Sequence, residues 1–432
     1  LKARHADTSP PICRSLAIVL CLCGFMGPFL GGRFGRRMSA ILLWVGLLCA
    51  GSVAFQPLRT TALVAGGDER GAGVSPPTSR GCASKSPGDT YVVALMFAGR
   101  QSRLRLSLAY VDELVASCHI DEVHIWNYTK SRDDVEFVEG LSSREAYQVF
   151  YPEWRYGAAK PAMYKYVEAY DFYRHEAGNS SQRRWKPMWP GANAENTVLV
   201  KLDDDIVFLD VVRFPCFVSY VRNHTEMFLT SGNVVNHPVA DYYRTQYTPG
   251  FVEEFPSLAV YPKALMDLEG QGGFTAWGSA WLNGTAALEL HRQFTQDPRR
   301  FAEAAHSDFV EEHASCLVFK PPLLDAELGP FGQGRLQINL VGLRWAVWDE
   351  VSDMIRVVPA DSDYLVDETA LTQFATVFPN HQECIYIPFL AAHLGYHEQV
   401  PEVDSALPFY EKMLEDLQSD GFKRSVRPSS CF

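Results

Sequence analysis

The middle of the chain alternates apolar strand-like runs with helical patterns, and this alternation limits the possible folds more than any other feature. Tyr91–Ala98, Glu122–Trp126 and Thr197–Leu202 are apolar runs, whereas Leu104–Ala116 and Lys160–Tyr173 have helical spacing. Continuous apolar runs are typical of strands buried on both faces. The strand–helix–strand order favours a parallel sheet covered by helices, with ligands at the carboxyl ends of its strands. The sequence therefore predicts a nucleotide-binding, Rossmann-like α/β domain.

Two apolar stretches near the start, Leu16–Leu30 and Met38–Phe55, are each close to the roughly 17–25 residues that cross a bilayer. An arginine cluster (Arg33, Arg36 and Arg37) separates them. Because positive residues prefer the cytoplasmic side, the cluster would send the rest of the chain into the lumen. We expect a single-pass type II signal anchor at Met38–Phe55. The alternatives are cleavage after Ala54 and a two-span hairpin with a cytosolic body.

These features predict five segments. Residues 1–37 are basic and apolar, either a cytosolic segment or an extension of the gene model, and residues 38–55 are the anchor. Residues 56–90 are rich in Gly, Pro, Ser and Thr, which is typical of a flexible stem. Residues 91–400 form the folded domain, and residues 401–432 are expected to be a C-terminal tail.

Charge narrows the range of partners. The chain has 39 Lys and Arg residues against 51 Asp and Glu residues, which gives a formal net charge of −12. A general nucleic-acid binder needs a basic face that displaces phosphate counterions. We therefore expect no nucleic-acid partner.

Sequons and cysteines agree with the secretory pathway. Four N-glycosylation sequons follow the anchor, at Asn127, Asn179, Asn223 and Asn283. Six cysteines also follow it, namely Cys82, Cys118, Cys216, Cys316, Cys384 and Cys431. They show no CxxC pattern of a metal site, so we expect one or two disulfides whose pairing the sequence leaves open.

Three consecutive carboxylates, Asp203, Asp204 and Asp205, stand where one apolar run ends and another, Ile206–Phe208, begins. Buried carboxylates are costly unless they meet a cation, so a divalent metal is their natural partner. The two-residue period of a strand would put Asp203 and Asp205 on one side and Asp204 on the other. Nucleotide-sugar transferases hold a metal diphosphate at such an Asp-x-Asp motif. The alternative is an Asp-rich turn or helix cap.

At these residues the chain resembles the GT-A glycosyltransferases, which carry a DxD metal motif on one α/β domain with a mixed sheet. Ordered blocks between Phe97 and Tyr396 also resemble an uncharacterised group of such enzymes that is frequent in fungi. The blocks are FAGRQSRLRLSLAYVDEL, DEVHIWNYT, VKLDDDIVFLD, SGNVVNHPV, RLQINLVGL, DETALTQF and AAHLGY. The resemblance implies a hexosyltransferase-like enzyme of the Golgi membrane. It would use Mn²⁺ or Mg²⁺, a UDP-linked sugar as donor, and a glycan or glycoprotein as acceptor.

The resemblance also implies roles for particular residues. Arg100 would line the nucleotide pocket together with Asp133 or Asp134. The three carboxylates of the DxD motif would follow: Asp203 would face the ribose or the metal, Asp204 would help to bind the cofactor, and Asp205 would ligate the metal. Arg100 could equally be a solvated surface residue.

His393 occupies the place of a late histidine that completes the metal site in many GT-A enzymes. The apolar run Cys384–Ala392 would bring it to a strand end, and imidazole with carboxylates suits manganese. The related blocks usually read His-Phe/Tyr-Ser-Phe, whereas this chain reads His-Leu-Gly-Tyr. A histidine satisfied within the core is the alternative, and His397 is a second candidate ligand.

An inverting transfer also needs a carboxylate base within about 2.6–3.2 Å of the acceptor hydroxyl. Asp367 and Glu368 match an acidic pair of the related enzymes, and Asp308 follows the glycines at 272–273. We favour Asp367 or Glu368, although acids at a helix N-terminus are the alternative interpretation. Four tryptophans could stack on sugars or pack in the core, namely Trp277, Trp281, Trp345 and Trp348.

Two other function classes use the same features. The Asp cluster would also suit a metal-dependent hydrolase or phosphoryl-transfer enzyme, although the chain has no HExxH, Walker A or GxSxG motif. A catalytically inactive sugar-binding protein could have the same fold. Protection by UDP with manganese would separate the first hypothesis from both of these.

Overall fold

The computed structural model describes residues 85–86, 88–129, 131–152, 164–175, 185–237, 240–241, 284–303, 316–319, 338–357, 367, 371–372, 382–395, 399 and 402–422. All of them belong to one compact unit, Thr78–Phe432. The predicted anchor, the segment before it and most of the predicted stem lie outside these residues. Within the described ranges, no helix is both long enough and apolar enough to span a membrane.

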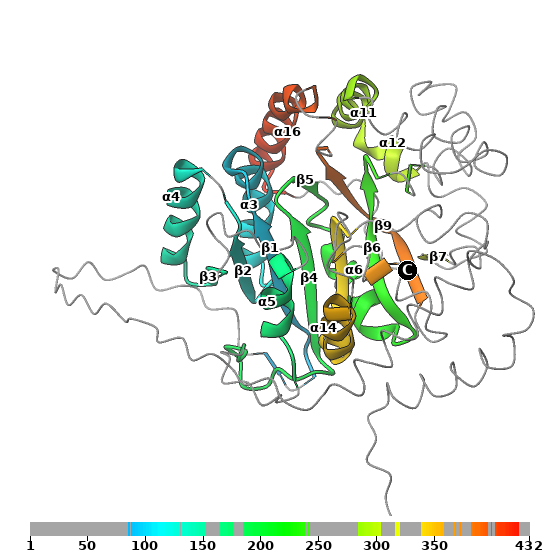
Figure 1. Cartoon of the computed structure of the whole chain (residues 1–432). Coiled ribbons are helices and arrows are strands. Elements are labelled where there is room, and N and C mark those ends of the chain that lie inside the picture. Colours follow the sequence, from blue (N-terminus) through cyan, green and yellow to red (C-terminus); the bar gives the residue numbers. More distant parts are fainter. Residues whose placement is uncertain are drawn as a thin grey trace, which may run out of the picture. The chain divides into compact units, whose positions relative to one another are not determined.

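A nine-stranded sheet, counted over the described residues, forms the centre of this unit (Figure 1). Its strands run in the order β3-β2-β1-β4-β8-β6-β9-β5, and β7 pairs with β9. The strands are β1 (Tyr91–Ala98), β2 (Glu122–Asn127), β3 (Tyr147–Phe150), β4 (Thr197–Asp203), β5 (Ile206–Leu209), β6 (Met227–Val235), β7 (Cys316–Phe319), β8 (Leu340–Arg344) and β9 (Gln382–His393).

The sheet is mixed. Strands β1 to β4 are mutually parallel, whereas β8 runs antiparallel to both β4 and β6. Strand β9 is parallel to β6, so it shares the direction of β4, and β5 and β7 run against it. From β1 the chain moves outward to β2 and β3, then returns to β4 on the other side of β1. The strand order therefore reverses between β1 and β4.

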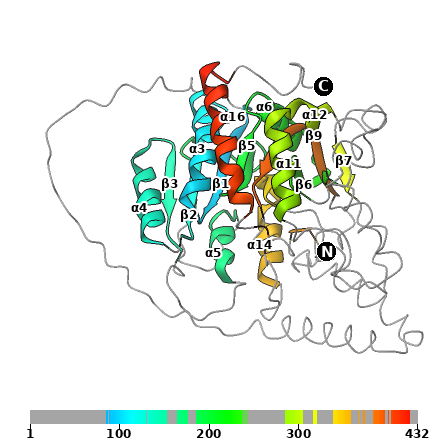
Figure 2. The same cartoon turned by 90° about the horizontal axis from the view of Figure 1, so that it is seen from above.

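Helices cover both faces of the sheet (Figure 2). Residues of α3, α4, α6, α11, α12 and α16 belong to the core on one face, and residues of α5 and α14 to the core on the other. The helices are α3 (Gln101–Ala116), α4 (Arg132–Gly140), α5 (Tyr164–Phe172), α6 (Phe214–Asn223), α11 (Gly284–Gln296), α12 (Pro298–Glu303), α14 (Trp348–Val357) and α16 (Leu407–Ser419).

Strand β1 is continuously apolar because both of its faces pack into a core. Val92, Ala94 and Met96 pack into the core beneath α3, whereas Val93 and Leu95 pack into the core beneath α5 and α14. All of these side chains are buried, because helices cover both faces of the strand. The predicted α/β fold with a mixed sheet flanked by helices is confirmed.

The C-terminal residues differ from the predicted tail. A short 3₁₀ turn, Val403–Ala406, leads into α16, whose Tyr410 is fully buried in the main core. Arg103 of α3 forms an ion pair with Asp404 at 2.6 Å. An amphipathic helix that can cover α3 and α11 gains more by packing than by remaining solvated. Residues 402–422 are therefore part of the folded domain.

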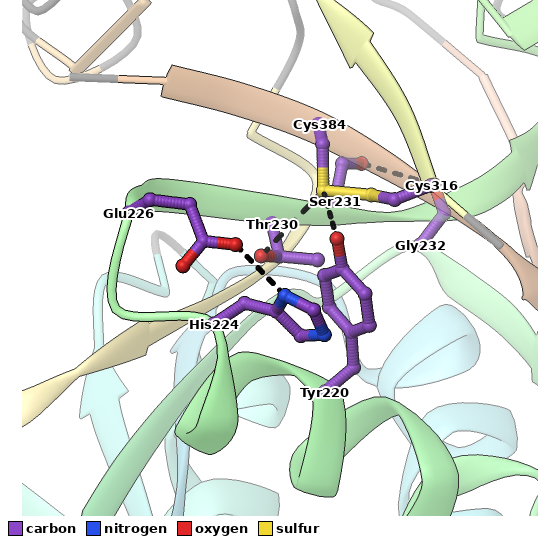
Figure 3. The surroundings of a disulfide bond; sticks show 8 residues. All are labelled: Tyr220, His224, Glu226, Thr230, Ser231, Gly232, Cys316 and Cys384. Carbon is purple, nitrogen blue, oxygen red and sulfur yellow. Dashed lines mark hydrogen bonds and ion pairs between the residues drawn. A yellow bond between two sulfur atoms is a disulfide. The ribbon is translucent and has the colours of Figure 1, made fainter. Parts of the chain in front are cut away.

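Strands β7 and β9 are linked by a disulfide between Cys316 and Cys384 (Figure 3). The Tyr220 hydroxyl of α6 lies 3.9 Å from the Cys384 sulfur. Cys118 and Cys216 are disulfide-bonded as well. The domain therefore has at least two disulfides, where the cysteine count predicted one or two.

Candidate functional site

Three strands bring the predicted site residues to one edge of the sheet. Strand β1 ends immediately before Gly99 and Arg100, and β4 ends at Asp203, which pairs in register with Phe97. Asp204 and Asp205 form the link to β5. Strand β9 runs in the same direction as β4 and ends at His393, which pairs with Ile206. The carboxylates and the histidine therefore meet beside the reversal in strand order.

Arg100 bridges two of the three carboxylates. Its Nη2 atom lies 2.7 Å from Asp204 Oδ1 and 2.6 Å from Asp205 Oδ2. The Gly99 backbone N–H donates to Asp204 Oδ2 at 2.6 Å. The side chain of Arg100 is 44% exposed, whereas each of these aspartates is only 6% exposed. We call Asp203, Asp204 and Asp205 the acidic turn. Arg100 therefore lies between the acidic turn and solvent.

Asp205 also contacts two buried side chains, Arg103 and His393. Arg103 Nη1 lies 3.4 Å from its Oδ2, and His393 Nε2 lies 3.2 Å from its Oδ1. The backbone N–H of Leu394 donates to the Asp205 carbonyl at 2.8 Å. Burial alone would raise the pKa of Asp205, but His393 and the guanidinium groups of Arg100 and Arg103 hold that pKa below its ordinary value. Asp205 is therefore a carboxylate at neutral pH.

Asp203 has hydrogen-bond partners that Asp205 does not share, although the two carboxylates interact: burial raises the pKa of Asp203, Lys201 lowers it, and the charge of Asp205 raises it. Lys201 Nζ donates to Asp203 Oδ1 at 2.5 Å, and Asn339 Nδ2 donates to Oδ2 at 3.1 Å. The alternation holds within β4 for Lys201 and Asp203 but ends with the strand, because Asp204 and Asp205 belong to a turn. Asp204 and Asp205 share Arg100 instead.

Two of the three side chains predicted to bind a metal, Asp205 and His393, are neighbours in the structure. Two ligands about 2.1 Å from an octahedral metal lie about 3 Å apart, which the 3.2 Å separation of Asp205 Oδ1 and His393 Nε2 fits. Asp205 Oδ1 is buried, and among the described residues it accepts no well-aligned hydrogen bond. In the part of the chain that the structure describes, however, no three His, Cys, Asp or Glu side chains are arranged to hold a metal. Asp205 and His393 fit a metal as a pair, while Asp203 faces Lys201.

Asp133 and Asp134 lie in the first turn of α4. Asp134 Oδ1 accepts from the backbone N–H of Gln101 at 2.8 Å, and Gln101 is the first residue of α3. A carboxylate at a helix N-terminus satisfies an unpaired N–H and interacts favourably with the helix dipole. Asp134 therefore anchors the start of α3 next to Arg100, and Asp133 is exposed.

Of the three candidate bases, the structure describes Asp367. Glu368 and Asp308 lie outside the described residues. Its side chain is buried, and the Tyr170 hydroxyl donates to Asp367 Oδ2 at 3.3 Å. Burial, followed by the charges of Asp367 and Asp203, raises the pKa of Tyr170. Both carboxylates therefore lie near this one phenol.

Of the candidate tryptophans, Trp345 and Trp348 are core residues. Trp348 is fully buried and stacks on Tyr170 with ring centroids 5.4 Å apart, and Trp345 is 8% exposed. Trp277 and Trp281 lie outside the described residues. A sugar platform at Trp345 or Trp348 is excluded, because their faces are covered by protein.

An aromatic cluster beside Asp203 was not predicted. Phe97, Tyr128 and Tyr166 have ring centroids 5.1–5.6 Å apart, and Tyr128 and Tyr166 are both partly exposed. Burial, then the charges of Asp367 and Asp203, raises the pKa of Tyr166. Aromatic residues after β2 and on α5 could have suggested this cluster only once the sheet order was known.

His291 was also missed. Its Nε2 donates to the Leu394 carbonyl at 2.5 Å, and its Nδ1 accepts from the Tyr410 hydroxyl at 2.7 Å. Asn236 Nδ2 also donates to the Leu394 carbonyl, at 3.2 Å. Burial lowers the pKa of His291 to about 3, so the ring is neutral. The Leu394 carbonyl, one residue after His393, is therefore held by two donors.

Comparison with known proteins adds no family assignment. No family model matches the chain, and neither a curated protein nor a solved structure matches it. We therefore infer function from the residues at this edge of the sheet.

Proposed function

We propose that this chain is a metal-dependent glycosyltransferase of the GT-A type. It would move a sugar from a nucleotide sugar, UDP-linked, to an acceptor hydroxyl on a glycan or glycoprotein. One observation carries the proposal: Arg100 and the Asp203–Asp205 turn lie together where the strand order reverses between β1 and β4. Open α/β sheets bind their ligands outside the carboxyl ends of the strands at this point.

The side chains at this edge suit a metal diphosphate. A bound Mn²⁺ or Mg²⁺ would draw negative charge from the leaving diphosphate as a Lewis acid. Asp205 and His393 would hold the metal, since their nearest side-chain atoms are 3.2 Å apart. Arg100 is exposed enough to reach an anionic ligand, and arginine can bind phosphate through two N–H groups at once.

Asp367 is our proposed base in an inverting transfer. It would accept the proton of the acceptor hydroxyl as the hydroxyl oxygen forms its bond to the sugar and the sugar–phosphate bond breaks. Its burial and the Tyr170 hydrogen bond favour a fixed orientation. Burial, followed by the charges of Asp367 and Asp203, raises the pKa of Tyr170. This shared effect supports a position of Asp367 near the Asp203 carboxylate.

The disulfides support a lumenal position for the domain. Cys316 pairs with Cys384, and Cys118 and Cys216 are also disulfide-bonded. Disulfides form and persist in oxidising compartments such as the secretory pathway. We propose a Golgi membrane protein that is anchored by residues 38–55.

The proposal is tested with the full chain in detergent, first by thermal unfolding. UDP with Mn²⁺ should raise the melting temperature more than either alone, since a ligand that binds only the folded state stabilises it. Asp205→Asn should remove this protection. Asp416→Asn is the matched control, because Asp416 is exposed and forms a surface ion pair with Lys412 on α16.

Turnover is then followed as nucleotide release from a panel of nucleotide sugars, with and without glycan acceptors. Acceptor-stimulated UDP release is the expected result. Release that acceptors do not stimulate would indicate a hydrolase, and protection without turnover would indicate an inactive sugar-binding protein. If no nucleotide with Mn²⁺ or Mg²⁺ protects the chain and no nucleotide sugar is consumed, the proposal is wrong.

A further inference from the structure

Each carboxylate of the acidic turn already has a cationic partner within the protein. Lys201 pairs with Asp203 at 2.5 Å, and Arg100 pairs with both Asp204 and Asp205. A metal that binds Asp205 must therefore share this carboxylate with a guanidinium or displace it. Since like charges at such short range repel strongly, displacement is the favoured course.

The cations differ in how firmly they are held. Lys201 and Arg103 are 3% and 2% exposed, and each has a second partner, the Ile338 carbonyl and Asp404 respectively. Arg100 is 44% exposed, and its ion pairs within the described residues are with Asp204 and Asp205. Arg100 directly precedes α3, so rotation of its side chain can release the guanidinium without disturbing the helix.

We infer that Arg100 is an exchangeable counter-ion of the acidic turn. It neutralises Asp204 and Asp205 when no donor is bound, and it moves onto the diphosphate of the nucleotide when a metal takes its place on Asp205. This inference rests on the proposed function, because the diphosphate is what gives the displaced guanidinium a new partner.

The exchange has a thermodynamic consequence. Metal alone removes Arg100 from Asp205 and leaves it with Asp204, so one of its two ion pairs is lost without replacement. Metal with diphosphate supplies an anion that a guanidinium can bind through two N–H groups. The two ligands should therefore bind cooperatively, and each should strengthen binding of the other by the same factor.

Arg100→Gln tests the exchange because it moves two affinities in opposite directions. Without the competing cation, Mn²⁺ alone should bind about tenfold more tightly to the full chain. At saturating Mn²⁺, UDP should bind about tenfold more weakly, because its arginine partner is gone. Both changes lie within the usual range of coupling between sites. Free Mn²⁺ is measured by electron paramagnetic resonance, and UDP by calorimetry.

Arg105→Gln is the matched control. Arg105 lies on the same helix, is exposed and packs over the Phe137 ring, so its loss removes the same charge outside the acidic turn. Its Mn²⁺ and UDP affinities should match those of the unmodified chain. Equal changes in Arg105→Gln and Arg100→Gln would reduce the effect to net charge and overturn the inference.

Weaker or unchanged Mn²⁺ binding in Arg100→Gln would also overturn the exchange, while UDP binding with Mn²⁺ to the unmodified chain would leave the proposed function standing. If the unmodified chain binds neither ligand, the proposed function itself fails. Should Arg100→Gln not fold, Arg100→Met decides, because it removes the charge and keeps an unbranched side chain. Mn²⁺ alone should again bind more tightly, since the cation that Nη2 presents to Asp204 and Asp205 is gone, and unchanged binding would contradict the inference.

Discussion

His393 Nε2 lies 3.2 Å from Asp205 Oδ1, although the two residues are 188 positions apart in the sequence (393 − 205). Backbone pairing makes this contact: Ile206 and His393 are register partners in β5 and β9, and Leu394 donates to the Asp205 carbonyl at 2.8 Å. The pair is therefore fixed by the sheet, and a change in one side chain should not separate the strands.

Asp205→Asn should lower both the affinity for UDP with Mn²⁺ and the free energy of unfolding. The amide keeps the size of the side chain but removes the charge that Arg100, Arg103 and His393 face. We expect UDP affinity at saturating Mn²⁺ to fall at least tenfold. Breaking a buried ion pair typically costs about 3–5 kcal/mol, and Arg103 keeps Asp404, so we expect roughly 1–3 kcal/mol here. Urea unfolding and UDP titration measure the two effects, and an unchanged UDP affinity would contradict the site.

Glu122 should matter to stability and not to ligand binding. It is fully buried at the start of β2, and it accepts hydrogen bonds from His124 Nε2 at 2.7 Å, Trp185 Nε1 at 3.0 Å and the Met188 N–H at 2.6 Å. Glu122→Gln would turn an amide N–H₂ toward some of these donors and leave buried groups unpaired, which costs about 2–3 kcal/mol.

The measurement for Glu122→Gln is the urea midpoint together with UDP affinity. Glu136→Gln is the control, since Glu136 is 60% exposed in a surface pair with Arg132 and should change stability by less than about 0.5 kcal/mol. Loss of UDP affinity in folded Glu122→Gln would show that the opposite edge of the sheet also takes part in binding.

His291 should make stability depend on pH. Burial lowers its folded-state pKa to about 3 from an ordinary value of 6.5. A depressed folded-state pKa contributes stability that is present above pH 6.5 and is lost as pH falls, because the unfolded chain takes up the proton first. The loss is about 1.4 kcal/mol for each pH unit between 6.5 and 3. His291→Gln should show a shallower fall in urea midpoint below pH 6.5, and an equal slope would contradict the assignment.

The strands and the acidic turn could be predicted because a buried strand appears in the sequence as a run of apolar residues. Strand β1 is apolar at every position since helices cover both of its faces. The same reasoning predicted that one strand ends at the Asp cluster and that another ends at His393, where β4 and β9 do end. Helix α3 begins at Gln101, three residues before the predicted start, because Asp134 of α4 accepts its first N–H.

Contacts between distant segments leave no such pattern in the sequence. Arg103 is buried between Asp205 and Asp404, and an arginine at helical spacing ordinarily lies at the surface. His291 meets the Leu394 carbonyl only because α11 packs against the end of β9. The alternation could not predict the partners of all three aspartates, since the strand ends at Asp203 and the next two residues belong to a turn.

Burial separates two of the four sequons. Asn223 is exposed at the end of α6, whereas Asn127 is 1% exposed and its Oδ1 accepts from the Thr129 N–H at 3.1 Å. In protein from secretory membranes, Asn223→Gln should therefore reduce the mobility shift that endoglycosidase causes. Asn127→Gln should leave the shift unchanged. A complete absence of any shift would contradict the lumenal orientation.

The last prediction separates chemistry from binding. A base acts only as the acceptor hydroxyl attacks, so its loss should lower turnover and leave donor affinity intact. Asp367→Asn should bind UDP with Mn²⁺ normally, yet kcat should fall by roughly two to four powers of ten, the usual weight of general-base catalysis. Glu368→Gln and Asp308→Asn are assayed beside it at saturating donor, because both were candidates from the sequence.

Tyr170→Phe tests whether the orientation of Asp367 matters to turnover. The Tyr170 hydroxyl donates to Asp367 Oδ2 at 3.3 Å, and this bond favours a fixed orientation of the carboxylate. Without the bond kcat should fall while UDP affinity with Mn²⁺ stays the same, because a misplaced base matters only as the acceptor hydroxyl attacks. An unchanged kcat, with only Asp308→Asn inactive, would assign the base to Asp308 and leave Asp367 a buried partner of Tyr170.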